Sequence, residues 1–454
     1  MRFWQWPRNV LLIVYCFASS HHLLLTLFSV TDLIILALSH ADAPFSSTIF
    51  SLAKEWARNC RVFYIEHPFT LKDYWSRRHE HSIQQRRNAL LYGKNIYRSI
   101  SGAPDNLVAV TPRLTLPINS LPEGKSYEWL SRLNDQILYE TIRKITSDYN
   151  VQQYIFLNSF DPFYGRYFPA SFQPLLYIYQ SVDDISQEPY IARHGVRLEN
   201  EIIAHHADLT LATSKNLAQA KSQWSPHTHL LPNAADVTLF RTALEHPLPK
   251  PPELQNRPHQ GKVILYTGVI SDLRIDYALL NYIARQHADK TLLLVGPYHA
   301  HECRQHGLDQ LPNIILAGAK PIDQLPAYLQ HADCAIIPFL MNTLTKSIYP
   351  LKINEYLAAG KPVVTTPFSD DIISFGNIVY MTPSPVQFSD YIEQAIYNNN
   401  PLVQLERLQI AENNAWTKRA EQFWHIVAPY LDDTTNPMPH KTDKAAALPL
   451  RINL

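Results

Sequence analysis

A lysine and a glutamate lie three residues apart on a short predicted helix whose two ends are both marked in the sequence. Lys352 and Glu355 share one face of this helix, because residues at i and i+3 are neighbours on a helix surface. Pro350 suits the first helical turn, and Gly360 suits the left-handed position after the last turn. A helix start with a lysine can bind phosphate, and the carboxylate one turn on can hold a ribose diol. The same spacing also fits a surface ion pair on an ordinary capped helix.

The segments around this helix alternate between apolar, β-rich runs and helix-length stretches from residue 32 onward, which is typical of parallel α/β sheets. A proline-rich stretch, 246–258, separates two such series and is expected to be a linker. We therefore predict an α/β fold with two doubly wound domains facing across a cleft, where ligands bind at the strand ends. The expected strands are 32–38, 61–65, 106–110, 154–157, 175–179, 209–212 and 229–231, followed by 262–266, 291–295, 313–316, 334–337 and 362–365.

Composition excludes several classes of function. The 40 basic and 40 acidic residues cancel, so no nucleic-acid partner is expected. The four cysteines are far apart and form no C-x-x-C pair, which argues against a structural zinc site and suits a reducing cytosol. The 12 glycines form neither a G-x-G-x-x-G nor a Walker loop, and no Asp-x-Asp occurs. A phosphate site would therefore rely on helix ends and basic side chains.

The N-terminus permits several interpretations. Arg2 and Arg8 precede an apolar run, 10–18, which residues 19–22 separate from a second apolar run, 23–30. The first run is too short to span a bilayer, and the interruption weakens a spanning helix built from both. The alternatives are a secretory signal or membrane anchor, an interfacial segment, and an extension of no structural consequence.

Several short motifs follow one another along the chain. They are Tyr179–Asp184, Ala207–Ser214 and Leu231–Phe240 in the first half, and Gly268 with Ile275-Asp276, Leu293–Pro297, Asn342–Thr345 and Lys352–Val364 in the second. Each motif is weak alone, but their order resembles that of GT-B fold glycosyltransferases. The resemblance is strongest to bacterial group 1 enzymes that build exopolysaccharides, capsules or cell-wall glycans, and it covers about residues 32–430.

This resemblance implies a role for several residues. Glu355 would hold the ribose hydroxyls of a nucleotide-sugar donor, and Lys352 would neutralise charge on the departing diphosphate. Gly268 would let the diphosphate approach the backbone, and Tyr298 would stack on or border the base, although a core or rim tyrosine is equally compatible. No metal or other cofactor is expected, and the acceptor would be a saccharide or a lipid-linked molecule.

The sequence departs from the family pattern at three places. Ser347, counted among the donor-binding candidates, stands where the first carboxylate of a Glu-x7-Glu pattern is usual, so the sugar contacts and the stereochemical outcome stay open. Residues 39–44 lack the glycines usual after the first strand. Asn233-Ala234 replaces the usual Asn-Gly.

An acceptor hydroxyl needs a base, and two groups of residues are candidates. Asp183 and Asp184 follow a strand end that should face the cleft, although aspartate is also a favoured helix cap. His40 and Asp42, after the first strand, are the second choice, and each also fits an ordinary turn.

The function predicted from these motifs is transfer of a sugar from a nucleotide diphosphate to a saccharide or lipid-linked acceptor. A non-catalytic sugar-nucleotide-binding protein and a sugar-nucleotide epimerase of the same fold are the alternatives. We expect a cytoplasmic protein or one at the inner face of the membrane, where the pairs Arg77-Arg78 and Arg86-Arg87 in a polar or mobile insertion, 72–100, would meet anionic lipid. The predicted segments are an apolar extension (1–30), an acceptor-side domain (31–241), a linker (242–260), a nucleotide-sugar domain (261–402), a C-terminal helix (403–431) and a polar tail (432–454).

Overall fold

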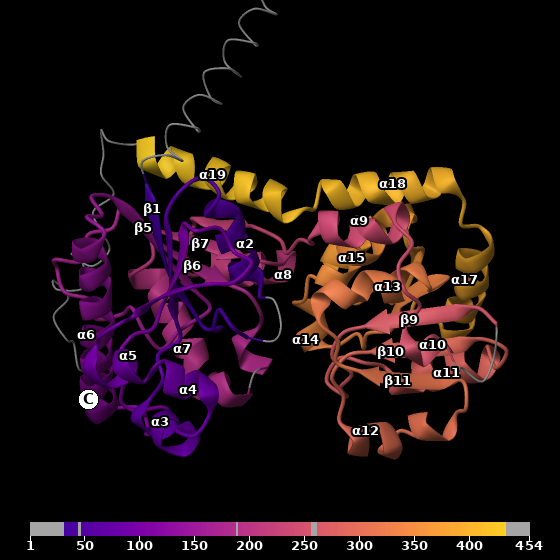
Figure 1. The fold of residues 1–454 in the computed structure, drawn as a ribbon, viewed down its shortest axis with the longest axis horizontal. Helices are drawn as coiled ribbons and strands as arrows, with labels where there is room; N and C mark the ends of the chain where they lie inside the picture. The colour runs from indigo at the N-terminus through magenta and orange to yellow at the C-terminus, as the bar shows by residue number, and fades with distance from the viewer. Residues whose placement is uncertain (1–30, 44–46, 188, 256–260, 433–454) are drawn as a thin grey trace, which may run out of the picture.

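The computed structural model describes residues 31–43, 47–187, 189–255 and 261–432, which form two halves that each contain a sheet (Figure 1). The predicted apolar extension, and the polar tail from residue 433 onward, lie outside the described residues. Within the described part of the chain, no helix is long and apolar enough to cross a membrane.

The first half contains an eight-stranded sheet in the order β3-β4-β2-β1-β5-β6-β7-β8. Neighbouring strands are parallel except for β3, a short edge strand that pairs antiparallel with β4 and has no apolar run to predict it. The strands are β1 (Asp32–Ala37), β2 (Val62–Glu66), β3 (Tyr97–Ser99), β4 (Leu107–Val110), β5 (Tyr154–Ser159), β6 (Leu176–Ser181), β7 (Leu209–Ala212) and β8 (Thr228–Leu230).

The second half contains a six-stranded, entirely parallel sheet in the order β11-β10-β9-β12-β13-β14. In both sheets the strand order reverses beside the first long strand, β1 or β9, which confirms the predicted doubly wound arrangement. The strands are β9 (Val263–Thr267), β10 (Thr291–Val295), β11 (Ile314–Gly318), β12 (Cys334–Ile337), β13 (Val363–Thr365) and β14 (Tyr380–Met381).

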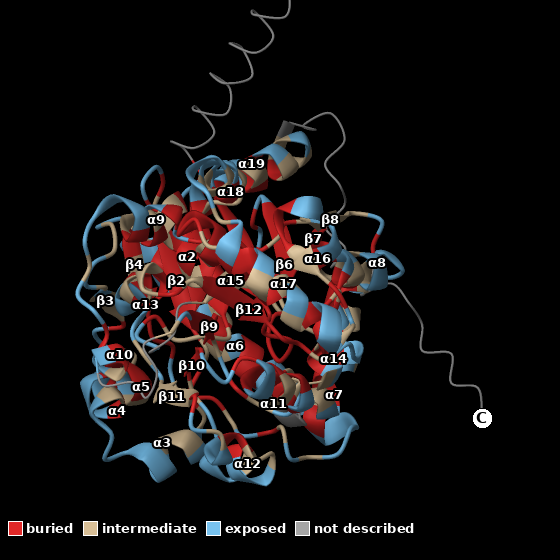
Figure 2. Ribbon diagram, turned by 90° about the vertical axis from the view of Figure 1, so that its right-hand side faces the viewer, coloured by how far each residue is buried: buried red, intermediate tan, exposed pale blue. Residues whose placement is uncertain are grey.

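Both faces of each sheet are covered, so buried residues gather in the strands (Figure 2). Alternate residues of β1 show how this arises. Leu33 and Ile35 pack into one apolar cluster with helices α2 (Thr48–Trp56) and α19 (Trp416–Asp432), whereas Ile34 and Leu36 pack into another with α6 (Lys125–Asp148) and α7 (Pro189–His205). The helices of the first half are α2 (Thr48–Trp56), α3 (Leu71–Arg77), α4 (His81–Gln85), α5 (Arg87–Tyr92), α6 (Lys125–Asp148), α7 (Pro189–His205) and α8 (Lys215–Ser222). Those that follow are α9 (Val237–Glu245), α10 (Pro252–Gln255), α11 (Tyr277–Gln286), α12 (Ala300–Gln305), α13 (Leu325–Gln330), α14 (Thr343–Lys346), α15 (Leu351–Ala358), α16 (Asp370–Ile373), α17 (Pro385–Tyr397), α18 (Pro401–Glu412) and α19 (Trp416–Asp432).

The end of the described chain forms two helices, where the sequence had predicted one over 403–431. Helix α18 packs on α15 of the second half, and α19 crosses to the first half and packs on α2 (Figure 1). The rings of Phe423 and Trp56 make this contact, with centroids 4.4 Å apart. The last helix therefore completes the core of the first half and ties the two halves together.

Candidate functional site

A cavity of about 980 Å³ lies between the two halves, at the carboxyl edges of both sheets. The first half contributes the turn after β1 and helix α2, and the second contributes the ends of β9 and β10 and the first turns of α15. Clefts at this edge of doubly wound sheets are where such folds bind ligands. The lining includes His40, Ala41, Phe50, Lys54, Glu55 and Arg58 from the first half, and Gly268, Arg274, Gly296, Pro297, Lys320, Lys352 and Glu355 from the second.

Lys352 and Glu355 line this cavity from α15, whose bounds confirm the predicted helix. Pro350 is its N-cap, and Gly360, with φ of 66°, takes the left-handed conformation that ends it. Both charged side chains are half-buried, and neither makes a hydrogen bond or an ion pair with another described residue. Burial lowers the pKa of Lys352 and raises the pKa of Glu355, because the opposite charge one turn away offsets the lost water only in part. An unpaired ammonium and carboxylate are thus available to a ligand.

The ammonium of Lys352 makes cation–π contacts with two aromatic rings. Its Nζ lies 4.8 Å from the ring centre of Phe339 and 5.4 Å from that of Tyr266. Arg274 lines the same cavity and adds a second positive charge, which lowers the pKa of Lys352 further. We did not identify Arg274 from the sequence, because it lies in an irregular loop after β9 where spacing carries no information. The positive charges of Lys352 and Arg274, which both line the cavity, favour an anionic ligand.

Gly268 and Gly296 end two adjacent strands and bring their backbones into contact beside Lys352. The Gly268 N–H donates a hydrogen bond to the carbonyl of Val295 at 2.8 Å. A Cβ on Gly296 would lie 1.9 Å from the Gly268 carbonyl oxygen, and φ is 131° at Gly268 and 154° at Gly296. These positions therefore require glycine, and they leave bare backbone facing the cavity.

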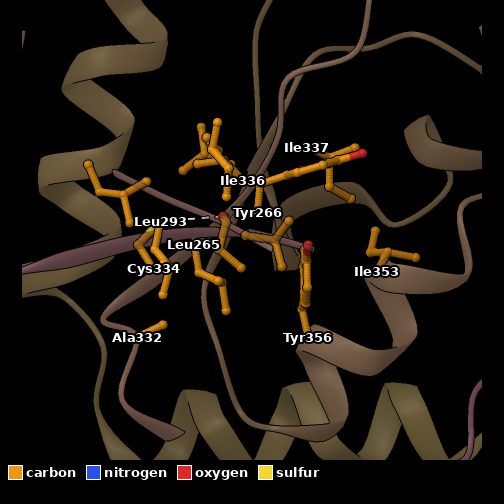
Figure 3. Packing of buried hydrophobic residues seen from close by; sticks show 14 of the residues in the cluster. Leu265, Tyr266, Leu293, Ala332, Cys334, Ile336, Ile337, Ile353 and Tyr356 are labelled. Carbon is orange, nitrogen blue, oxygen red and sulfur yellow. Dashed lines mark hydrogen bonds between the residues drawn. The ribbon is translucent and has the colours of Figure 1, made fainter. Parts of the chain in front are cut away.

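Tyr356 fixes the position of the helix that carries Lys352 and Glu355. Its hydroxyl accepts a hydrogen bond from the backbone N–H of Thr267 at 2.8 Å and lies 3.0 Å from the hydroxyl of that residue. Figure 3 shows Tyr356 projecting from α15 toward the buried residues of β9. These contacts fix the position of helix α15 against the end of β9 at the edge of the cavity.

His40 lines the cavity from the first half, as its place after the first strand predicted. Its ring stacks on Phe69, with centroids 4.6 Å apart. Burial lowers the pKa of His40 to about 4 and outweighs the opposing effect of the nearby Glu66 carboxylate. The imidazole is therefore neutral at neutral pH.

Glu66 is a fully buried carboxylate that organises the turn containing His40. It accepts hydrogen bonds from Arg86 at 2.9 Å, from Arg98 at 2.7 Å and from the backbone N–H of Ala41 at 3.2 Å. Both arginines come from the segment expected to be a polar or mobile insertion. That segment instead forms α3, α4, α5 and β3, and these ion pairs anchor it to the site.

The cluster of His40, Asp42 and Glu66 brings three potential metal-binding side chains within 4.8 Å of one another. Both carboxylates are already paired with guanidinium groups, those of Arg86 and Arg98. Two fixed cations disfavour a third positive charge, so this cluster does not fit a metal ion.

Asp183 and Asp184 follow β6 at the same sheet edge but do not line the cavity. The Asp184 carboxylate accepts hydrogen bonds from the backbone N–H of Ser186 at 3.0 Å and from its hydroxyl at 2.7 Å. This is the local capping geometry that the sequence offers as the alternative to a catalytic role.

Tyr298 and Ser347 also lie outside the cavity lining. Tyr298 follows the lining residue Pro297 and is 37% exposed. Ser347 is 1% exposed, and its Oγ accepts a hydrogen bond from the side chain of Asn216 at 2.7 Å. Because Asn216 belongs to α8, this bond joins the two halves.

Two doubly wound halves that face one another across a ligand-sized cavity define the GT-B class of fold. The chain is similar to α,α-trehalose 6-phosphate synthase from Burkholderia multivorans, with a TM-score of 0.61 and 10% identity over 92% of this chain and 100% of that one. It is also similar to HepE of Anabaena, solved in complex with UDP and glucose, with a TM-score of 0.55 and 14% identity over 87% and 99% of the two chains. These likenesses show the fold.

Residues 261–398, which lie in the second half, match the family described as glycosyl transferases group 1. TuaH of Bacillus subtilis (strain 168), assigned as a teichuronic acid biosynthesis glycosyltransferase, is 32% identical over 139 residues. This match covers 30% of the chain and 34% of TuaH, about a third of each. The family resemblance read from the motifs is confirmed.

Proposed function

We propose that this protein is a glycosyltransferase that moves a sugar from a nucleotide diphosphate to a saccharide or lipid-linked acceptor in the synthesis of a surface polysaccharide or cell-wall glycan. The observation that carries the proposal is that Lys352 and Glu355, both without an ion-pair partner among the described residues, line the same cavity as the bare backbone of Gly268. The family of residues 261–398, and the UDP and glucose bound to HepE, support a nucleotide-sugar ligand.

In this proposal the donor lies along the second half. Lys352 and Arg274 stabilise the negative charge that develops on the departing diphosphate, which approaches the backbone at Gly268. Glu355 accepts hydrogen bonds from the ribose hydroxyls, and Tyr298 borders the base. No residue assigned here requires a metal.

On the acceptor side, Asp183, Asp184 and His40 are the bases proposed from the sequence. On the donor side, Ser347 is the candidate for contact with the sugar. Of these three candidates, His40 is supported as the base because its imidazole lines the cavity and is neutral. The supply of nucleotide sugars supports a cytoplasmic protein, with contact at the inner face of the membrane. Helix α3 supports that contact because it buries no residue and ends in the exposed Arg77. Arg86 is buried and cannot contribute.

Thermal unfolding with a panel of UDP-sugars tests the proposal. A ligand at 100 times its Kd stabilises a protein by about 2.7 kcal/mol. We expect a stabilising UDP-sugar whose effect is lost in Lys352→Ala and Glu355→Ala and kept in Lys346→Ala, an exposed lysine on α14. The same sugar, radiolabelled, should then be transferred to a bacterial membrane lipid extract. Binding without transfer or hydrolysis would instead identify a non-catalytic binding protein, and conversion of the sugar without an acceptor would identify an epimerase.

A further inference from the structure

A histidine and a buried aspartate meet at the carboxyl edge of the first sheet, beside the turn that carries His40. His67 directly follows β2 and Asp161 follows β5, the two strands that flank β1. Nδ1 of His67 lies 2.6 Å from Oδ2 of Asp161. Since the carboxylate of Asp161 only accepts, Nδ1 carries the hydrogen, and Nε2 of the neutral ring carries a lone pair.

The aspartate of this pair is held rigidly. Asp161 is 0% exposed, and its Oδ1 also accepts a hydrogen bond from the backbone N–H of Phe163 at 3.3 Å. The side chain of Asn158 bonds to both the N–H and the carbonyl of Asp161, at 3.1 and 2.9 Å. The preceding residue, Phe160, has φ of 62°, a conformation that a bulky side chain rarely adopts. Strained backbone of this kind gathers where geometry serves function.

The other ring nitrogen of His67 is not used by the fold. Nε2 makes no hydrogen bond with any described residue, although the side chain is 23% exposed. His67 does not itself line the cavity, but it lies near His40, which does. A histidine whose first nitrogen is fixed by a buried carboxylate and whose second is open has the arrangement of an oriented general base.

The titratable groups that face His67 are Asp161, Asp73, His40 and Tyr164. Burial alone would lower the pKa of His67, but the Asp161 carboxylate, assisted by Asp73, outweighs it and raises the pKa above its ordinary value. Burial instead leaves His40 with a pKa of about 4 and raises the pKa of Tyr164 well above its ordinary value. The lowered pKa makes His40 a weak proton acceptor and the raised pKa makes His67 a stronger one, which favours His67 as the base.

We propose that His67 and Asp161 form the catalytic dyad on the acceptor side, with His67 as general base and Asp161 as its positioning residue. Nε2 of His67 takes the proton of the acceptor hydroxyl as that oxygen forms its bond to the anomeric carbon of the sugar. The bond from the anomeric carbon to the diphosphate breaks, and its electron pair leaves with the nucleoside diphosphate. This inference rests on the proposed glycosyl transfer and names a base that differs from Asp183, Asp184 and His40.

The test compares the full chain with His67→Gln, Asp161→Asn and the control His79→Gln, an exposed histidine after α3. The assay uses the UDP-sugar with the largest thermal shift and a bacterial membrane lipid extract as the acceptor. We expect kcat to fall about 100-fold or more in His67→Gln, with the Kd for UDP unchanged and the control unaffected. Full transfer by His67→Gln would overturn the dyad alone, whereas no transfer by the wild-type protein would overturn the proposed function.

A second readout separates catalysis from folding. In the wild-type protein, activity should rise with pH as His67 loses its proton. Asp161→Asn should move that rise to lower pH, because the pKa of His67 falls when the carboxylate is removed. Titration of the His67 imidazole by NMR, assigned by its absence in His67→Gln, should show the same direction. An unchanged His67 titration in Asp161→Asn would show that the two side chains are not coupled and would overturn the proposal.

Discussion

The ammonium-bearing end of Lys352 rests against Gly268, so closely that a Cβ on Gly268 would lie 3.0 Å from Cε and 3.2 Å from Nζ of the lysine. The two residues are 84 positions apart in the chain, 352 minus 268, and belong to α15 and the end of β9. The absence of a side chain at Gly268 therefore decides where the charge of Lys352 lies. This relationship makes the glycine part of the candidate donor site.

Gly268→Ala should weaken UDP binding about tenfold, because the added methyl group displaces Lys352 and covers the exposed backbone. Isothermal titration calorimetry with UDP measures the change. Gly376→Ala is a matched control: φ is 58° there, but no atom lies within 4 Å of the added Cβ. That variant should lose stability through backbone strain and keep its affinity for UDP, and equal losses of affinity in both variants would contradict our assignment.

Arg86→Met should lower the free energy of unfolding by about 3–5 kcal/mol, because it leaves the buried Glu66 carboxylate without one of its cations. Urea denaturation measures the loss. The neighbouring Arg87 is exposed, and Arg87→Met should change stability by less than about 0.5 kcal/mol. Similar values for the two variants would mean that the Glu66 ion pairs do not anchor the inserted helices.

The stability of the protein should depend on pH through His40. Its pKa is lowered by burial from 6.5 to about 4, so between these values the unfolded state binds a proton that the folded state does not. The contribution of His40 to the free energy of unfolding is fully present above pH 6.5 and is lost as the pH falls toward 4. His40→Asn should flatten the decline measured by chemical denaturation at pH 4.5, 5.5 and 7.5, whereas His79→Asn should leave it unchanged. Parallel curves for all three proteins would contradict a neutral, buried His40.

The hydrogen bond between Asn216 and Ser347 should couple the two halves. Asn216→Ala and Ser347→Ala are each expected to cost about 1 kcal/mol, and the double variant should cost less than the sum of the two. A double-mutant cycle on thermal unfolding gives the coupling energy. If the two costs simply add, the bond does not contribute to holding the halves together.

Contact with an anionic membrane should depend on helix α3. Trp75 is 65% exposed there and lies beside the exposed Arg78, whose guanidinium sits 5.6 Å from the indole ring centre. Trp75→Ser should reduce sedimentation with vesicles that contain phosphatidylglycerol, because an interfacial indole and adjacent cations both favour such a surface. Trp224→Ser, at an exposed tryptophan after α8, is the control and should not change sedimentation. Equal sedimentation of wild-type protein with neutral vesicles would contradict an electrostatic contribution.

Features that depend on near neighbours in the chain can be predicted from the sequence. The proline and glycine that bound α15 specify its ends, and the three-residue spacing of Lys352 and Glu355 puts both on one face. Apolar runs with turn residues between them predicted the strands, and their alternation with helices predicted two doubly wound sheets. Such signals are readable because they arise from local backbone preferences and from periodic burial.

Contacts between groups that are distant in the chain follow from the folded arrangement and not from local patterns. Nothing near Ser347 in the chain indicates that it bonds to Asn216, and nothing near His67 indicates that Asp161, 94 positions away, lies within hydrogen-bond distance. Arg86 looked like a surface cation and is instead buried against Glu66. Side chains from separate strand ends come together only when the parallel sheet brings those ends to one edge. The charges of Lys352 and Glu355 on α15, and His40 after the first strand, could thus be found from the sequence, whereas the pair of His67 and Asp161 became visible only in the folded chain.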